Sequence, residues 1–442
     1  MRELKAKVDG FLKKYGMDYK NISIEKECNT FIAEMKKGLE GTGGTLKMLC
    51  TYLSPEGEIP VREPVIVIDA GGTNLRVAVV TFDSKKTPVI EDFKVYPMPG
   101  TQGELTKEEF FHRIAEYLAP VIDRSSKIGF CFSYPTEILP NRDGKLIGFT
   151  KEVRVRDMNG EEIGANLLTA LRAMGYDGDK RVVVLNDTVA TLLGGKAAQP
   201  QRSFDSFIGF ILGTGTNTCY IETNANIIKV PALVNKPGST IINIESGGYG
   251  KAPGSVIDGY FDTMTVDPGR QLFEKMISGA YQGQLILQFL RKAAAEGLFS
   301  SEFAARVCNL NELTTTEVND FCLQPYSEDN VLACGAKTTG CAGNIADQVV
   351  VYYIVDAVVE RAAKLVAINL AAIMLKTGKG QNPCLPVCVT AEGSTFYKSK
   401  LFKGKLEYYV KEYLNDQMGL YCEFIHADKA TLVGTAIAGL LN

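Results

Sequence analysis

One short stretch organises the chain: residues 181–188, which read RVVVLNDT. Its run of β-branched residues predicts a buried strand, and polar side chains follow directly after the last apolar residue. In open α/β sheets, ligands bind outside the carboxyl ends of the strands. Asp187 is therefore a candidate base in a binding site. A purely structural alternative stays open, because Asn186, Asp187 and Thr188 also suit a helix N-cap, ahead of a helix expected from Val189.

The composition is that of an ordinary globular protein, with 45% hydrophobic and 22% charged residues among 442. This length predicts two lobes rather than one core. The net charge of -3 excludes the large basic surface that would bind nucleic acid or an anionic membrane. Charged residues such as Asp356 and Lys364 interrupt the longest apolar stretch, residues 349–375, which is therefore not a membrane span.

The cysteines and the N-terminus indicate the compartment. Eleven cysteines are too sparse for a disulfide scaffold in a chain of this length, and the charged first residues lack the apolar core of a signal peptide. We therefore expect a cytoplasmic protein. A zinc site is not expected, since the chain has only two histidines and no second cysteine pair at ligand spacing beside Cys384 and Cys388.

Two glycine-rich turns recur in the two halves of the chain. Residues 69–74 (DAGGTN) and residues 213–217 (GTGTN) each connect one predicted strand to another, whereas a P-loop opens a helix after its glycines. Backbone amides and threonine hydroxyls in such turns can hold phosphate oxygens, although a hairpin without function is the alternative for either turn alone. As a matched pair, they favour two related lobes that hold a nucleotide between them.

Other polar residues follow predicted strands or open predicted helices. Ser133 and Glu245 each come after an apolar run, Glu274 lies near the start of a predicted helix, and the turn at residues 391–395 follows another strand. Such groups can hydrogen-bond several hydroxyls of a sugar, although for each alone a solvated surface position is the commoner explanation. The longest predicted helix, residues 346–376, has apolar residues on more than one face and is assigned to the core.

Assembled in order, these stretches resemble the eukaryotic-type hexokinase family over nearly the whole chain. The matching motifs are residues 31–39 (FIAEMKKGL), 46–49 (LKML), 69–76 (DAGGTNLR), 132–135 (FSYP), 186–188 (NDT), 213–217 (GTGTN), 273–276 (FEKM) and 392–394 (EGS). The resemblance implies an α/β protein with the actin-like ATPase (ribonuclease H-like) fold. Two lobes are expected, each with a mixed five-stranded sheet flanked by helices, with a cleft between them. The expected smaller lobe comprises residues 65–186 and 429–442, and the larger lobe comprises residues 1–64 and 187–428.

The resemblance also implies an ATP-dependent hexokinase. Such an enzyme transfers the γ-phosphate of ATP to the 6-hydroxyl of a hexose, here glucose as the first expectation, and gives hexose 6-phosphate for glycolysis. Asp187 takes the place of the catalytic base, and Lys151 is expected to offset charge on the transferred group. By the same resemblance, the hexose is held by Ser133, Thr150, Lys151, Asn186, Asp187, Asn217, Glu245 and Glu274.

The nucleotide side is assigned in the same way. Asp69 matches the carboxylate that places Mg²⁺ through water. The phosphates and the rest of the nucleotide are expected against the two turns and their neighbours: Gly71, Gly72, Thr73, Asn74, Arg76, Gly213, Thr214, Gly215, Gly393 and Ser394. The expected partners are therefore only small molecules, a hexose and ATP, and the expected state is a monomer or homodimer.

The sequence departs from the family pattern at Cys50, at Gln284 and in the loop after Glu245, residues 246–250 (SGGYG), which could alter the hexoses that fit. Residues 309–343 resemble the family least. Rival interpretations are a kinase for an N-acetylated hexosamine, a non-catalytic sugar sensor, and an actin-like filament or chaperone ATPase. The presence of Asp187 and of a candidate for every expected hexose ligand favours the hexokinase.

Overall fold

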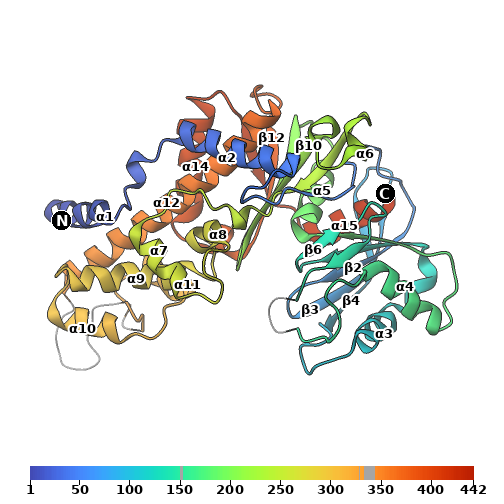
Figure 1. Cartoon of the computed structure of the whole chain (residues 1–442), viewed down its shortest axis with the longest axis horizontal. Coiled ribbons are helices and arrows are strands. Elements are labelled where there is room, and N and C mark those ends of the chain that lie inside the picture. Colours follow the sequence, from blue (N-terminus) through green and yellow to red (C-terminus); the bar gives the residue numbers. More distant parts are fainter. Residues whose placement is uncertain (150–152, 328, 333–343) are drawn as a thin grey trace.

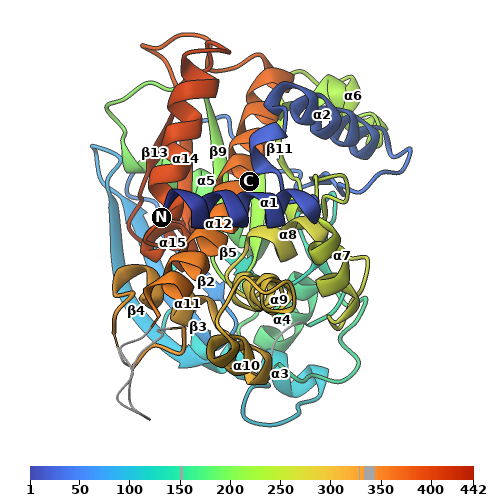
Figure 2. The same ribbon diagram turned by 90° about the vertical axis from the view of Figure 1, so that its left-hand side faces the viewer.

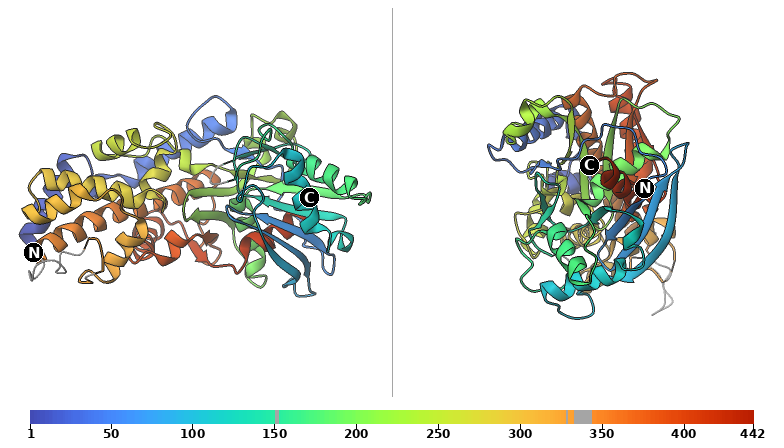
Figure 3. Two further views of the ribbon diagram at one scale, coloured as in Figure 1. Left: turned by 90° about the horizontal axis from the view of Figure 1, so that it is seen from below. Right: turned by 90° about the vertical axis from the view of Figure 1, so that its right-hand side faces the viewer.

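The computed structural model describes residues 1–149, 153–327, 329–332 and 344–442. The chain forms two lobes, each with its own mixed β-sheet, side by side along the longest axis of the molecule (Figure 1). Most helices of the larger lobe gather at the end remote from the smaller lobe (Figure 3). This arrangement confirms the predicted α/β class with two lobes.

The smaller lobe is built on a five-stranded sheet. Its strands are β2 (Val65–Ala70), β3 (Asn74–Phe82), β4 (Pro88–Pro97), β5 (Lys127–Phe132) and β8 (Arg181–Leu185). In the order β4-β3-β2-β5-β8, the first three are antiparallel and the last three run parallel. Ile66 and Ile68 pack with α3 (Lys107–Leu118) and α4 (Ile163–Ala173), whereas Val65 and Val67 pack with α15 (Ala430–Leu441). Helices on both faces explain why β2 is buried throughout and apolar except at Asp69.

The sheet of the larger lobe repeats this plan with one addition. Its strands are β1 (Leu49–Cys50), β9 (Ser206–Leu212), β10 (Thr216–Thr223), β11 (Ser239–Asn243), β12 (Val387–Glu392) and β13 (Cys422–Ile425). Their order is β1-β11-β10-β9-β12-β13. The prediction of five strands is therefore wrong for this sheet, because β1 pairs antiparallel with β11 as a sixth strand. A two-residue strand leaves no periodic pattern in the sequence.

The core of the larger lobe surrounds α12 (Ile345–Thr377), the predicted long helix, which ends at Gly378 in a left-handed conformation. The helices α1 (Arg2–Lys14) and α2 (Ile24–Glu40) pack against it (Figure 2). Its buried apolar residues belong to one cluster with α9 (Gln282–Ala295) and β9. Among the described residues, no helix is both long and apolar enough to span a membrane.

The remaining elements are short. They are β6 (Thr136–Ile138), β7 (Gly144–Leu146), α6 (Pro231–Val234), α7 (Val256–Thr263), α8 (Leu272–Ile277), α10 (Ser301–Asn309), α11 (Thr315–Leu323), α13 (Ser394–Lys398), α14 (Phe402–Tyr409), the 3₁₀ turns η1 (Tyr19–Asn21), η2 (Ile122–Arg124), η3 (Asn224–Asn226) and η4 (Ser246–Gly248), and the π-helical turn η5 (Val410–Asn415).

Two helices join the two lobes, because each follows a strand of one sheet and packs on the other sheet. The helix α5 (Asp187–Ala198) follows β8 of the smaller sheet but packs on β9 and β12 of the larger sheet, and α15 follows β13 but packs on β5 and β2. The two helices also pack on each other. Their approach requires glycine, because a Cβ on Gly434 would lie 1.8 Å from the Ala190 carbonyl oxygen. The end of β8 therefore lies where the two sheets come together.

Candidate active site

The first part of the site lies at the carboxyl ends of three parallel strands. In the sheet register, Asp69 of β2 pairs with Cys131 of β5, and Cys131 pairs with Leu185 of β8. Asn186 then caps α5, since its side chain accepts a 2.9 Å hydrogen bond from the Thr188 amide. The helix begins at Asp187 and not at Val189, so the prediction of its start was wrong. Asn186 is thus a cap, and the cap leaves the Asp187 carboxylate at the strand end.

The charge of the Asp187 carboxylate affects the pKa of one residue in each lobe, at the junction where the two sheets come together. Burial raises the pKa of Asp69 and Asp187 raises it further, whereas Arg76, whose Nη1 lies 2.9 Å from Asp69 Oδ2, lowers it. Burial also raises the pKa of the Cys219 thiol on β10 of the larger lobe, and Asp187 adds to that shift. Asp187 is therefore close enough to one residue of each lobe to change its ionisation.

A second group of polar side chains belongs to the larger lobe. The Nδ2 of Asn217 donates to Glu245 Oε1 at 3.2 Å and to Asn243 Oδ1 at 2.8 Å, and the Nδ2 of Asn243 donates to the same Glu245 oxygen at 2.8 Å. Sequence reasoning missed Asn243 as a member of this group. The signal was present, since residues 242–245 alternate apolar and polar and so place Asn243 and Glu245 on one face.

Glu274 joins this group from α8. Its Oε2 accepts a 2.8 Å hydrogen bond from the Thr216 amide at the start of β10. Burial raises the pKa of Glu274, the Thr216 hydrogen bond lowers it, and the charge of Glu245 raises it again. The structure therefore brings Asn217, Glu245 and Glu274 together as a set of hydrogen-bond acceptors and donors.

The first glycine bend, residues 71–74, connects β2 and β3 as predicted. The Gly71 amide donates to the Asn74 carbonyl at 3.0 Å, and the Tyr134 hydroxyl donates to the Gly71 carbonyl at 2.9 Å. Thr73 and Asn74 are exposed, and Gly72 is half-exposed. Ser133 lies beside this bend, because its amide donates to the carbonyl of Ala70 at 3.2 Å.

The second glycine bend, residues 213–215, connects β9 and β10. The Gly213 amide donates to the Gly215 carbonyl at 2.9 Å, and the Gly213 carbonyl accepts from the Gly279 amide at 2.8 Å and from the Thr395 hydroxyl at 2.9 Å. Gly393 has a φ of 112°, and a Cβ there would lie 2.2 Å from the Leu212 carbonyl oxygen. Only glycine therefore fits at position 393, where the turn after β12 packs against the end of β9.

A pocket opens beside this second bend. Its volume is about 410 Å³, and its lining includes Thr214 and Ser394 together with Thr315, Asn319 and Val355. The polar residues of the bend and the apolar side chains of α12 thus line one space. A purine base and its phosphates present the same combination of an apolar face and charged oxygens.

Two hexose ligands predicted from the sequence, Thr150 and Lys151, lie outside the described residues. In the part of the chain that the structure describes, no three His, Cys, Asp or Glu side chains gather as a metal site would require. Asp69 is 4% exposed and paired with Arg76, so it offers a single carboxylate. That donor fits Mg²⁺ held mainly by phosphate oxygens and water, which is the usual arrangement for this ion with a nucleotide.

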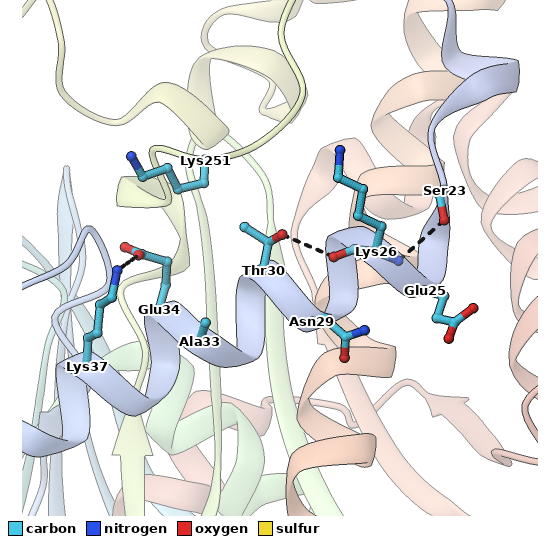
Figure 4. Close-up of a pocket in the computed structure, with 9 residues that line it drawn as sticks. All are labelled: Ser23, Glu25, Lys26, Asn29, Thr30, Ala33, Glu34, Lys37 and Lys251. Carbon is cyan, nitrogen blue, oxygen red and sulfur yellow. Dashed lines mark hydrogen bonds and ion pairs between the residues drawn. The ribbon is translucent and has the colours of Figure 1, made fainter.

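A separate hollow of about 680 Å³ lies along α2 (Figure 4). Charged and polar side chains line it, including Lys26, Lys251, and Glu34, which is paired with Lys37 at 2.8 Å. None of the predicted site residues is among the residues that line this hollow. It is therefore not part of the candidate active site.

Comparisons with known proteins show the family of the chain. Two family models, both described as hexokinase, match residues 7–197 and residues 207–441. Hexokinase-5 of Oryza sativa subsp. japonica is 30% identical over 438 residues, which cover 92% of this chain and 84% of the rice protein. Hexokinase-1 of Nicotiana tabacum is 29% identical over 444 residues, with 95% and 88% covered.

Solved structures are similar as well. The hexokinase of Schistosoma mansoni in complex with glucose has a TM-score of 0.74 and 25% identity, and the match covers 99% of both chains. A further crystal structure of a hexokinase has a TM-score of 0.76 at 23% identity. The resemblance and the actin-like ATPase fold predicted from the sequence are thereby confirmed. The chain belongs to the hexokinase family.

Proposed function

We propose that this member of the family phosphorylates glucose at its 6-hydroxyl, with ATP as donor and Asp187 as the base. Family membership gives ATP-dependent phosphorylation of a hexose, and glucose is the sugar bound to the similar Schistosoma mansoni enzyme. The observation that supports the role of Asp187 most strongly is its position at the junction, where its charge raises the pKa of Asp69 in one lobe and of Cys219 in the other.

The hexose is proposed to lie between Asp187 and the polar group of the larger lobe. Glu245 Oε1 already accepts two hydrogen bonds, from Asn217 and Asn243, so its Oε2 is the oxygen proposed to accept from the sugar. Glu274, Asn186 and Ser133 supply further donors and acceptors, and Thr150 and Lys151 are proposed to complete the set. A site built from such groups selects for hydroxyls, because an unmatched partner would leave a buried polar group unpaired.

The nucleotide is proposed to lie along the two glycine bends, with its base in the pocket beside Thr214 and Ser394. The phosphates would meet the amides of residues 71–74 and 213–215 and the guanidinium of Arg76. Gly393 allows the close packing of the second bend. Asp69 would hold Mg²⁺ through water, and the bound ion would neutralise charge on the phosphate oxygens.

The chemical step asks the protein for positioning and for one proton transfer. The 6-hydroxyl oxygen attacks the γ-phosphorus, and its proton passes to the Asp187 carboxylate. The bond between the γ-phosphorus and the bridging oxygen breaks, and ADP leaves. A positioned base of this kind contributes about 10²–10⁴-fold to the rate. Lys151 is proposed to offset charge on the transferred phosphoryl group.

The lobes are proposed to be residues 65–186 with 429–442 and residues 1–64 with 187–428, and to close when hexose binds. Support for these bounds comes from α5 and α15: α5 follows β8 of the smaller sheet but packs on the larger sheet, and α15 follows β13 of the larger sheet but packs on the smaller one. Closure would exclude water, a competing acceptor of the phosphoryl group. Small-angle scattering should show a smaller radius of gyration with glucose, and an unchanged radius would contradict closure. We further propose a cytoplasmic enzyme of glycolysis that acts as a monomer or homodimer.

The direct test is an ADP-release assay with glucose, mannose, fructose and N-acetylglucosamine, each with and without Mg²⁺. We expect the highest kcat/KM with glucose and no turnover without Mg²⁺. A preference for N-acetylglucosamine would replace glucose as the substrate. Absence of turnover with every sugar would contradict the proposal.

A further inference from the structure

A buried polar network lies directly behind the Asn217–Glu245 pair. Thr218 on β10, Ser246 in η4 and Asn369 on α12 form it, and each is at most 1% exposed. Thr218 Oγ1 lies 3.1 Å from Ser246 Oγ and accepts a 2.9 Å hydrogen bond from Asn369 Nδ2. We call these three residues the Asn369 network. They tie three segments that are distant in the sequence to one hydroxyl.

The position of Asn369 costs free energy of folding. Its neighbours on α12, Ile368 and Leu370, belong to the apolar core, and its Oδ1 has no hydrogen-bond partner among the described residues. A buried amide with an unpaired oxygen destabilises the folded chain, whereas leucine would fill a similar volume without that cost. Packing alone therefore does not explain an asparagine here.

Two residues of the Asn369 network, Thr218 and Ser246, also hydrogen-bond the side chain of Asn217. The Oδ1 of Asn217 accepts hydrogen bonds from the amides of Thr218, at 2.7 Å, and of Ser246, at 3.3 Å. The two residues that Asn369 ties together through their side chains thus fix the Asn217 amide through their backbones. With its oxygen fixed, Asn217 directs its Nδ2 at Glu245 Oε1.

Glu245 needs such support. Its φ of 57° lies in the left-handed region, which costs free energy for a residue with a side chain and persists only where the surroundings impose it. Residues 246–248 follow as a 3₁₀ turn, and they belong to the loop in which this sequence departs from the family pattern. Ser246 is the residue where that loop meets the network.

We propose that Asn369, acting through Thr218 and Ser246, is a positioning residue that orients Asn217 and Glu245 and so determines which hexoses the enzyme accepts. The inference rests on the proposed function, because it takes Asn217 and Glu245 as hexose ligands. Asn369 itself lies behind the site and does not touch the sugar. Its effect is therefore on hexose binding and not on the nucleotide or the chemical step.

The test compares Asn369→Leu with a matched control on the same helix. Gln348 is also a buried amide of α12 with an unpaired oxygen, and it lies 21 residues away, about 30 Å along the helix. Asn369→Leu should raise the KM for glucose about 10-fold, with the KM for ATP and kcat changed less than about twofold. The ratio of kcat/KM for glucose to that for its C2 epimer mannose should fall. Gln348→Leu should change none of these values.

An unchanged KM for glucose in Asn369→Leu, or equal changes in the KM values for glucose and ATP, would overturn the inference. If Asn369→Leu does not fold, Thr218→Val gives the same test, because it removes the shared hydroxyl and keeps the shape. The double variant Asn369→Leu/Thr218→Val should change the KM for glucose no more than the larger of the two single changes. Additive changes would contradict an action of both residues through the same hydrogen bond. The wild-type enzyme separates the two claims: inactivity with every hexose overturns the proposed function and this inference together, whereas an active wild type with unchanged variants overturns only this inference.

Discussion

The two glycine bends occupy equivalent turns of two similar sheets, yet they are held differently. The bend at residues 213–215 receives hydrogen bonds from Gly279, Ala280 and Thr395, which come from two other segments of the larger lobe. The bend at residues 71–74 is held from outside the hairpin by Tyr134 and Met98 of its own lobe, and its tip is exposed. The second bend is thus the more firmly held of the two, since it receives three hydrogen bonds from outside its hairpin and the first bend receives two.

The acids beside the two bends differ in the same way. Asp69, next to the first bend, is paired with the cation Arg76, whereas the Glu274 carboxylate, next to the second, accepts a hydrogen bond from the Thr216 amide. Burial raises the pKa of both carboxyls. The first acid depends on an ion pair within its lobe, and the second depends on backbone geometry.

The largest contrast is expected from alanine at one glycine of each region. Gly393→Ala forces a side chain into the left-handed region and 2.2 Å from the Leu212 carbonyl, so it should destabilise the chain by about 2 kcal/mol or more and raise the KM for ATP. In Gly71→Ala the nearest atom, the Asn74 carbonyl oxygen, lies 3.4 Å away, so the loss should be about 1 kcal/mol or less. Thermal unfolding measures the loss of stability in the two variants, and steady-state kinetics measure their KM for ATP. Equal losses in the two variants would remove the distinction between a more and a less firmly held bend.

Glu274→Gln should separate stability from function. Glutamine can still accept the Thr216 hydrogen bond but no longer offers a charge to the hexose, so the KM for glucose should rise about 10–10²-fold. The pKa of Glu274 is raised in the folded chain, so this carboxyl stabilises the fold fully below its unfolded pKa and loses that contribution as the pH rises through its folded pKa. The variant should therefore gain melting temperature relative to wild type at pH 7 and not at pH 4. A lower melting temperature at pH 7 would contradict this role of burial.

The same residue predicts a pH dependence of binding. If the ionised form of Glu274 accepts the hexose hydroxyls, the affinity for glucose should fall as the pH falls through the raised pKa of this carboxyl. Calorimetric titration with glucose between pH 4 and pH 8 measures it. The acidic decline should be absent in Glu274→Gln, and a decline of the same size in that variant would assign it to another group.

The smallest contrast concerns one hydroxyl at each bend. Thr395→Val removes the donor to the Gly213 carbonyl and should cost about 1 kcal/mol of stability, with a rise in the KM for ATP. Thr73→Val replaces an exposed hydroxyl in the other bend and should change stability by less than about 0.5 kcal/mol. Denaturant unfolding compares the two. A larger loss of stability in Thr73→Val than in Thr395→Val would show that the bend at residues 71–74 is the more firmly held one.

Much of this architecture could be predicted from local patterns. The apolar runs gave the central strands, the glycine turns gave both hairpins, and the stretch at residues 181–188 gave the strand end with Asn186 and Asp187. The rest depends on pairing between distant segments. Asn243 joins the site because β11 pairs with β10 in a register that sets Asn243 opposite Cys219, and β1 exists only because residues 49–50 pass along β11. The alternation of residues 242–245 places Asn243 and Glu245 on one face, but no periodicity records that this face meets Asn217. In the same way, Asn369 is a polar residue in a core helix whose contact with Thr218 leaves no pattern in the sequence.

The most direct test of the account is Asp187→Asn, examined for binding and chemistry separately. Because the chain contains no tryptophan, glucose affinity is best measured by calorimetry. Phosphoryl transfer is measured in a single turnover with ATP labelled at the γ-phosphate. We predict a glucose affinity within about fivefold of wild type and a transfer rate about 10²–10⁴-fold lower, because asparagine keeps the shape but does not accept the proton. A transfer rate close to that of wild type would contradict the role of Asp187 as the base.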